Sequence, residues 1–124
     1  MEEVRTPDSP QPIGPYSQAV KSRGFIFCAG QIPLDPKTGQ IVEGGIEEQT
    51  RRVLLNIQNI LRAGGTDLNK VVKATVFLTD LDDFQGFNRV YSEFFQPPYP
   101  ARTTVQVARL PRGSKIEIEV IAEI

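Results

Sequence analysis

Apolar residues recur at two different spacings along the chain, and the spacing separates predicted helices from predicted strands. Between Ile46 and Ala63 the spacing is helical, and two glycines that follow supply a C-terminal stop. This segment predicts an amphipathic helix about 27 Å long. A second helix is predicted after Asp82 or Asp83, either of which can cap it, and it ends before Pro97. Its apolar positions are Phe84, Phe87, Val90, Tyr91, Phe94 and Phe95.

Alternating apolar and polar residues predict the strands. Residues 17–20 and 25–29 form a hairpin around a short turn at 21–24, and Val4 lies at best in a short edge strand. Residues 70–79 form the next strand, with one face made by Val72, Ala74, Val76 and Leu78. Two further strands, at 102–108 and 115–122, complete the chain, and in the first of them the core-facing positions are Thr103, Val105 and Val107.

The predicted element order is β-β-α-β-α-β-β, which indicates an α+β layer within a single domain spanning residues 1–124. Two helices can cover only one face of a sheet of five or six strands. The other face would combine polar and apolar side chains, namely Arg102, Thr104, Gln106, Glu117, Glu119, Phe77 and Ile121. Such a face favours a subunit interface that also holds a polar site, although partial solvation in a monomer is an alternative.

Composition narrows the classes of function. The 124 residues are 40% hydrophobic and 23% charged, with a net charge of -1, so nothing draws the chain to nucleic acid or to a membrane. The N-terminus has neither a signal peptide nor a transit peptide pattern, and the expected location is the cytoplasm. The lone Cys28 reads as a small buried hydrophobe rather than a nucleophile.

Histidine is absent from the chain. Its absence excludes Ser-His-Asp and Cys-His nucleophile systems, HExxH zinc sites and histidine proton shuttles. Any chemistry must therefore use carboxylates, tyrosine, lysine, arginine, the thiol, backbone groups or water. A reaction with a low intrinsic barrier fits that inventory best.

Arg102 is the main candidate for a binding residue. It stands where a predicted strand leaves a proline-rich loop, and its guanidinium offers a planar set of donors that matches a carboxylate. A surface arginine or a structural ion pair explains the same local pattern.

Further candidates are each ambiguous alone. Tyr16 stands at a strand entrance, where it is either a site residue or an aromatic plug, and Gly30 permits close approach of a ligand or marks a bulge. Glu117 and Glu119 alternate with apolar residues, which places both on the face without helices, where a solvated strand face is the alternative. Asn88 in the second helix is either a ligand contact or solvent-facing.

Four spaced motifs resemble those of the reactive-intermediate deaminase family (RidA, or YjgF-like), and the resemblance runs from about Val4 to the C-terminus. In chain order the motifs cover residues 13–20, 29–33, 99–102 and 116–119, with the sequences IGPYSQAV, AGQIP, YPAR and IEIE.

The resemblance implies a chorismate-mutase-like α+β fold that forms a homotrimer around a central barrel, with clefts between neighbouring subunits. It implies hydrolysis of 2-imino acids, such as 2-iminobutanoate and 2-iminopropanoate released by pyridoxal-phosphate-dependent dehydratases, to 2-oxo acids and ammonia. No metal or organic cofactor is implied.

Matched position by position, the resemblance assigns Arg102 to the substrate carboxylate, Tyr16 to the lining of the cleft and Glu117 to the hydrolytic water. It places the backbone of Gly30 and Thr104 against the ligand. Asn88 matches a supporting asparagine. Ala29 also lines the site, but it stands where a serine is frequent, and some members have cysteine at Thr104.

Two other classes of function remain open from the sequence. A cleft that captures small 2-oxo acids can belong to a non-catalytic binding or regulatory module. A ribonuclease or translation-inhibitor role is attributed to some relatives. The net charge and the missing histidine argue against the second alternative.

Overall fold

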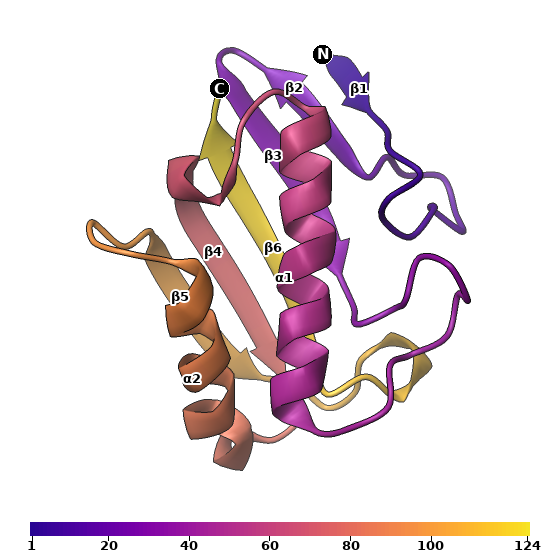
Figure 1. The fold of residues 1–124 in the computed structure, drawn as a ribbon, viewed down its shortest axis with the longest axis vertical. Coiled ribbons are helices and arrows are strands. Elements are labelled where there is room, and N and C mark those ends of the chain that lie inside the picture. The colour runs from indigo at the N-terminus through magenta and orange to yellow at the C-terminus, as the bar shows by residue number, and fades with distance from the viewer.

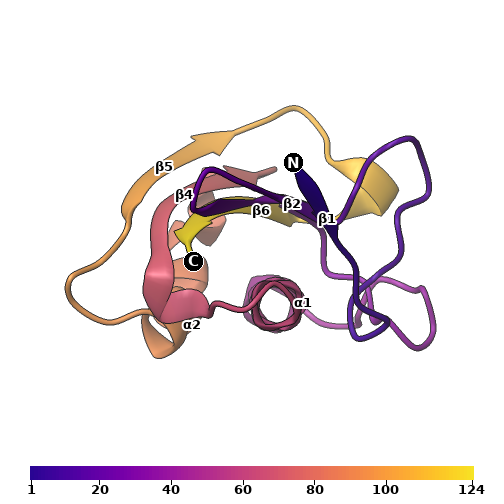
Figure 2. The same cartoon turned by 90° about the horizontal axis from the view of Figure 1, so that it is seen from above.

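A computed structural model describes residues 1–124 as a six-stranded sheet with two helices packed on one of its faces (Figures 1 and 2). The strand order across the sheet is β1-β2-β3-β6-β4-β5. The strands are β1 Glu2–Val4, β2 Ala19–Ser22, β3 Phe25–Gln31, β4 Val71–Leu78, β5 Ala101–Gln106 and β6 Ile116–Glu123. This arrangement confirms the predicted α+β class and the one-sided placement of the helices.

Chain connections explain the mixture of strand directions. β2 and β3 form the predicted antiparallel hairpin, and its tight turn places Arg23 and Gly24 at φ 53° and 83°, the left-handed conformation that such turns require. β4 and β5 are parallel because helix α2, Phe84–Phe94, crosses between them. β5 is thereby left at one edge of the sheet and β1 at the other.

Helix α1, Ile46–Ala63, has the predicted bounds. Its apolar stripe packs on the sheet and forms the centre of the core, with Val53, Leu54, Ile57, Ile60 and Leu61 fully buried. The predicted cap of α2 is only partly right, because Asp83 occupies the N-cap position without a side-chain cap hydrogen bond. None of the helices combines the length and the apolar composition that a membrane span requires.

The predicted orientation of β5 is wrong. Its register pairs Arg102 with Ala74 and Thr104 with Val76, and both β4 partners are fully buried beneath the helices. Arg102 and Thr104 therefore face the helices, and so does the next alternate residue, Gln106. The predicted core-facing residues of this strand, Thr103, Val105 and Val107, are instead exposed or only partly buried.

A bulge also changes the start of β4. Val71 pairs with Ala122 and Lys73 with Ile121, so Val72 is an extra residue in this strand. Val71 is consequently buried and Val72 exposed, the reverse of the predicted alternation. From Ala74 onward the predicted alternation is correct, because Ala74, Val76 and Leu78 are all buried.

The face without helices combines polar and apolar side chains as predicted, but Arg102, Thr104 and Gln106 were wrongly assigned to it. Glu117 pairs with Phe77 and Glu119 with Thr75, and these side chains lie opposite the helices. Apolar side chains on this face remain partly or largely exposed, namely Phe25, Phe27, Phe77, Val105 and Ile121.

Candidate functional site

Arg102 lies against the aromatic side chains of α2. Its guanidinium carbon is 4.8 Å from the ring centre of Tyr91, 4.9 Å from that of Phe87 and 5.6 Å from that of Phe84. These rings stand at positions i, i+3 and i+7 and so share one face of the helix. The three ion pairs of the chain involve other arginines, so the charge of Arg102 has no acidic partner.

Two buried hydroxyl groups lack hydrogen-bond partners, and both belong to this region. One is the phenol of Tyr91, and the other is Oγ1 of Thr104, two residues from Arg102 on the same face of β5. Burial raises the pKa of Tyr91, and this effect outweighs the opposing influence of the positive charge of Arg102. The phenol is therefore neutral beside the guanidinium at physiological pH.

A cavity of about 450 Å³ opens beside Arg102. Asn88 and Tyr91 from α2 line it together with Tyr99 and Pro100 from the loop that precedes β5. The structure thus brings Asn88 and Arg102, two of the predicted site residues, to the same cavity. Thr104 lies next to this group but does not line the cavity.

A second cavity, of about 580 Å³, contains the other predicted residues. Tyr16, Ala29, Gly30 and Glu117 line it, and Glu119 stands at the same wall. Apolar side chains contribute much of the remaining surface, including Ile13, Ile32 and Leu34.

A β-bulge places Gly30 against Glu117. Cys28 pairs with Val120 but Gln31 pairs with Ile118, so β3 holds one extra residue between these pairs. A Cβ atom at Gly30 would collide with the carboxylate of Glu117 and lie 2.9 Å from its Cδ. The glycine is therefore a spatial requirement of the Glu117 position. It lies in a bulge, one of its two sequence-based interpretations, whereas close approach of a ligand stays a prediction.

Glu117 is partly buried, and its electrostatic surroundings disfavour ionisation. Burial raises its pKa, and the negative charge of nearby Glu119 raises it further. A carboxyl group tuned upward in this way is a better proton acceptor when ionised than an ordinary glutamate.

The loop that carries Tyr16 is held by a buried glutamine. Gln18 Oε1 accepts from the Thr6 backbone N–H at 2.8 Å, and its Nε2 donates to the carbonyls of Pro10 at 2.9 Å and Thr6 at 3.1 Å. The residue itself is 2% exposed. Tyr16 is half exposed at the mouth of the cavity, and its phenol oxygen is 3.5 Å from the Ile13 backbone nitrogen.

Helix α1 anchors two loops that border the same cavity. Asn56 is fully buried, and its Nδ2 donates to the carbonyl of Leu34 at 2.9 Å. The hydroxyl of Ser9 donates to the backbone carbonyl of Asn56 at 2.7 Å. One residue of the helix thus connects both loops that border the cavity.

The predicted site residues therefore fall into two groups within one chain. Arg102 and Asn88 lie beside α2, on the helix-covered face near the β5 edge, whereas Glu117 points to the face without helices. Tyr16, Ala29 and Gly30 accompany Glu117. Neither of these two cavities contains both Arg102 and Glu117.

Cys28 is buried as predicted. Burial raises the pKa of its thiol to about 12, and the charge of Glu119 adds to the effect. The thiol is therefore protonated and a poor nucleophile. No group of three or more Cys, Asp or Glu side chains is arranged to hold a metal ion.

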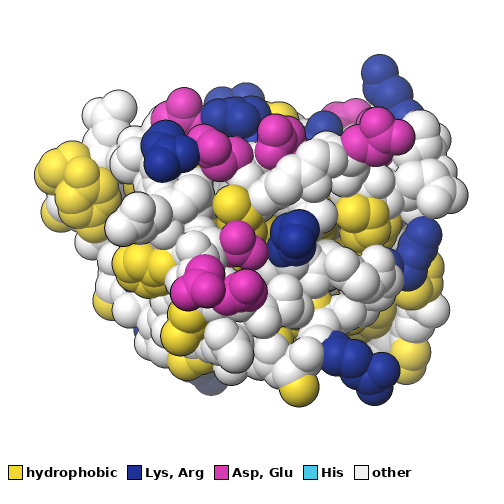
Figure 3. Space-filling view, turned by 90° about the horizontal axis from the view of Figure 1, so that it is seen from below, with side chains coloured by type: hydrophobic (Ala, Val, Ile, Leu, Met, Phe, Trp, Pro, Cys, Tyr) yellow, Lys and Arg dark blue, Asp and Glu magenta, His cyan; other side chains and the backbone are white.

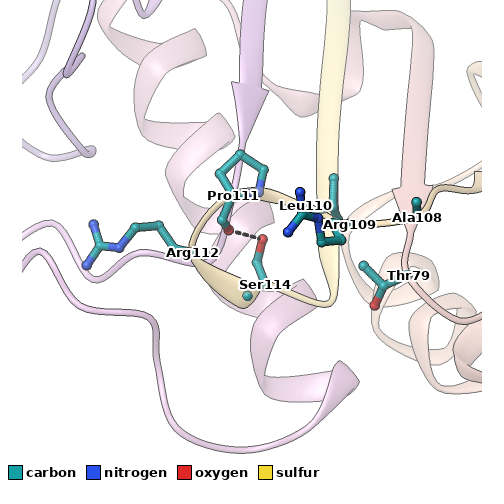
Figure 4. Close-up of a pocket in the computed structure, with 8 residues that line it drawn as sticks. Thr79, Ala108, Arg109, Leu110, Pro111, Arg112 and Ser114 are labelled. Carbon is teal, nitrogen blue, oxygen red and sulfur yellow. Dashed lines mark hydrogen bonds between the residues drawn. The ribbon is translucent and has the colours of Figure 1, made fainter.

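A third hollow, of about 660 Å³, lies at the end of the sheet where the 109–114 loop turns (Figure 4). The Ser114 hydroxyl donates to the carbonyl of Pro111 at 2.8 Å and closes this turn. Arg112 extends away from Thr79, and its Nη2 donates to the carbonyl of Gly39 at 3.2 Å. None of the predicted site residues borders this hollow.

Acidic and basic side chains are interspersed on the face shown in Figure 3, which carries no continuous basic surface. This distribution agrees with the net charge of -1. A phosphate backbone would find no extended positive track on this face.

Sequence reasoning missed two contributors to these groups. Tyr91 was assigned only to the core, because the spacing that aligns it with Phe87 is also ordinary core spacing. Gln18 lies within a quoted motif but received no role. Its side chain bonds four backbone groups that lie eight to twelve residues away, and such contacts leave no local sequence signature.

Comparisons with known proteins agree on one family. The family described as endoribonuclease L-PSP matches residues 6–124. A RutC family protein of Pyrococcus horikoshii is 56% identical over 98% of this chain and 96% of its own length. The 2-iminobutanoate/2-iminopropanoate deaminase of Mus musculus is 50% identical over 96% of this chain and 88% of its own. The crystal structure of E. coli TdcF with bound serine aligns with a TM-score of 0.95 at 43% identity, covering 100% of this chain and 99% of TdcF.

Proposed function

Because the chain belongs to the endoribonuclease L-PSP family, which includes the RidA (YjgF-like) proteins, we propose that it is a deaminase that hydrolyses 2-imino acids to 2-oxo acids and ammonia. The substrates are small 2-imino acids such as 2-iminobutanoate and 2-iminopropanoate. The deaminase named in Mus musculus, 50% identical to this chain, supports that substrate class.

The unpaired guanidinium of Arg102 is the observation that carries the proposal. A buried or partly buried arginine ordinarily has an acidic partner, and this one has aromatic rings instead. A 2-imino acid supplies the missing carboxylate. A charge-assisted hydrogen bond of this kind contributes roughly 1.5–3 kcal/mol, and a bidentate pair also fixes the orientation of the substrate.

Glu117 is the residue that we assign to the hydrolytic water. Its ionised carboxylate aligns a water molecule that adds to the C=N carbon, while the imine nitrogen gains a proton. The resulting carbinolamine expels ammonia and leaves the 2-oxo acid. Because protonated imines react readily with water, orientation of the partners provides most of the acceleration. Tyr16, with Gly30 and Ala29, lines the cleft around the reacting atoms.

The complete site is proposed to form between two copies of the chain in a homotrimer. Within one chain Arg102 and Glu117 face different sides of the sheet, so one substrate needs Arg102 from one copy and Glu117 from its neighbour. The partly exposed apolar residues of the helix-free face, including Phe27, supply surface for that contact. The assembly also places Asn88 and Thr104 beside the substrate carboxylate.

A coupled assay tests the proposal. A threonine dehydratase generates 2-iminobutanoate, and the rate of 2-oxobutanoate formation is followed with and without this protein. The wild-type protein is expected to accelerate the reaction, Arg102→Ala to abolish the acceleration, and Glu117→Gln to slow it while ligand binding persists. Stoichiometric binding of 2-oxobutanoate without acceleration would instead indicate a binding module.

A further inference from the structure

The aromatic residues beneath Arg102 do more than fill the core. Phe87 and Tyr91 are almost fully buried, but Phe84 is 37% exposed, so the row of rings extends from the core to the surface next to the guanidinium. The rings are also held against one another, with centroids 6.3 Å apart for Phe84 and Phe87 and 5.3 Å apart for Phe87 and Tyr91.

Tyr91 is the best-supported member of this row. Its ring contacts that of Phe87 and also stacks on that of Phe95, with centroids 4.4 Å apart and an interplanar angle of 26°, so two neighbouring rings hold its position. It also borders the cavity that contains Arg102 and Asn88. Its phenol is buried and lies near the guanidinium without hydrogen-bonding geometry to it, so ring packing and the charge of Arg102 hold the side chain.

A guanidinium that rests on aromatic faces keeps its N–H donors free. An acidic partner would occupy those donors and compete with an incoming carboxylate, whereas a ring face attracts the positive charge without accepting a conventional hydrogen bond. The neutral phenol of Tyr91 likewise leaves the charge of Arg102 uncompensated. The aromatic rings therefore orient this guanidinium and leave its N–H donors available to a carboxylate.

We propose that Phe84, Phe87 and Tyr91 form an aromatic cradle that holds the Arg102 guanidinium ready for a substrate carboxylate, with Tyr91 as its principal positioning residue. The inference rests on the proposed function, because it assigns Arg102 to the carboxylate. It adds a role for the aromatic face of α2 that core packing alone does not require.

Calorimetric titration with 2-oxobutanoate tests the cradle. Tyr91→Leu removes the ring and is expected to weaken binding roughly three- to tenfold, the range typical of a cation–π contact. Tyr91→Phe keeps the ring and is expected to bind within about twofold of wild type on the same grounds. Phe94→Leu is the matched control, because Phe94 packs against the core from the same helix and its ring is not among those beneath the Arg102 guanidinium.

A second readout separates positioning from general loss of structure. Ring currents should shift the Arg102 side-chain N–H resonances of the wild-type protein, and Tyr91→Leu should remove much of that shift while Phe94→Leu preserves it. Unchanged affinity in Tyr91→Leu, or an equal loss in Phe94→Leu, would overturn the cradle. Failure of the wild-type protein to bind 2-oxobutanoate would overturn the proposed function itself, and the role of the cradle with it.

Discussion

Arg102 and Glu117 lie on opposite faces of the same sheet. The register places Arg102 beside Ala74, which is fully buried under the helices, and Glu117 beside Phe77, three residues further along β4. Side chains three residues apart on a strand point to opposite faces. The two residues to which the proposed function assigns the substrate carboxylate and the water therefore cannot serve one small substrate within one chain.

Gly30→Ala is expected to reduce imine hydrolysis at least tenfold, because the added Cβ displaces the Glu117 carboxylate. The backbone at Gly30 has no positive φ, so the loss comes from the collision and not from backbone strain. Gly45→Ala is a suitable control, since a Cβ there meets only Glu48 Oε2 at 3.9 Å. Steady-state rates of both variants check the prediction, and a fully active Gly30→Ala protein would contradict it.

Glu119→Gln is expected to move the acid limb of the pH–rate profile to lower pH. The negative charge of Glu119 raises the pKa of Glu117, so its removal lets Glu117 remain ionised in more acidic solution. The wild-type rate should fall as the pH drops through the raised pKa, because protonated Glu117 has lost the negative charge with which it orients the water and accepts a proton. An acid limb that stays in place or moves upward would show that another group controls the rate.

Gln18→Met is expected to lower the free energy of unfolding by about 1–3 kcal/mol, because it leaves the Thr6 N–H and the Pro10 carbonyl without partners in a buried setting. Loosening of this loop should also slow the reaction through Tyr16. Asn59→Ala removes a comparable bond, at 2.9 Å to the Asp8 carbonyl, from a solvent-accessible position. Chemical denaturation should show a much smaller effect for that control, and equal losses would argue against the role assigned to burial.

Cys28 is expected to resist a thiol-specific reagent in the folded protein at pH 8. Its pKa is raised to about 12 and its side chain is buried, so both thiolate formation and access are suppressed. Labelling should become complete only in denaturant. Rapid labelling of the native protein would show that the β2–β3–β6 region opens readily.

The sequence predicted the elements better than it predicted their faces. The bounds of α1 were accessible because Gly64 and Gly65 end a long, regular apolar stripe. The orientation of β5 was not accessible, since Arg102, Thr103, Thr104 and Val105 give both faces of an edge strand a mixed composition. Only pairing with β4 decides which side meets the helices.

The candidate site was predicted as a set of residues but not as a geometry. Motif resemblance identified Arg102, Glu117 and their neighbours, and the structure brings each group together around its own cavity. Which face of the sheet each of these residues occupies depends on how the strands pair, and no local sequence pattern encodes that register. The role inferred for Tyr91 was also not predictable from sequence, because its spacing in α2 is that of an ordinary core residue. The same stripe of side chains can pack a core and also hold a cation.

Subunit complementation between Arg102→Ala and Glu117→Gln tests the central claim, that one site takes these two residues from different copies. The two proteins are unfolded, mixed in equal amounts and refolded together, and imine hydrolysis is measured. The account predicts that the mixture regains about a quarter of the wild-type rate, the fraction of sites that combine two unmutated residues in a randomly mixed cyclic oligomer. A mixture no more active than the average of the separate variants would contradict it.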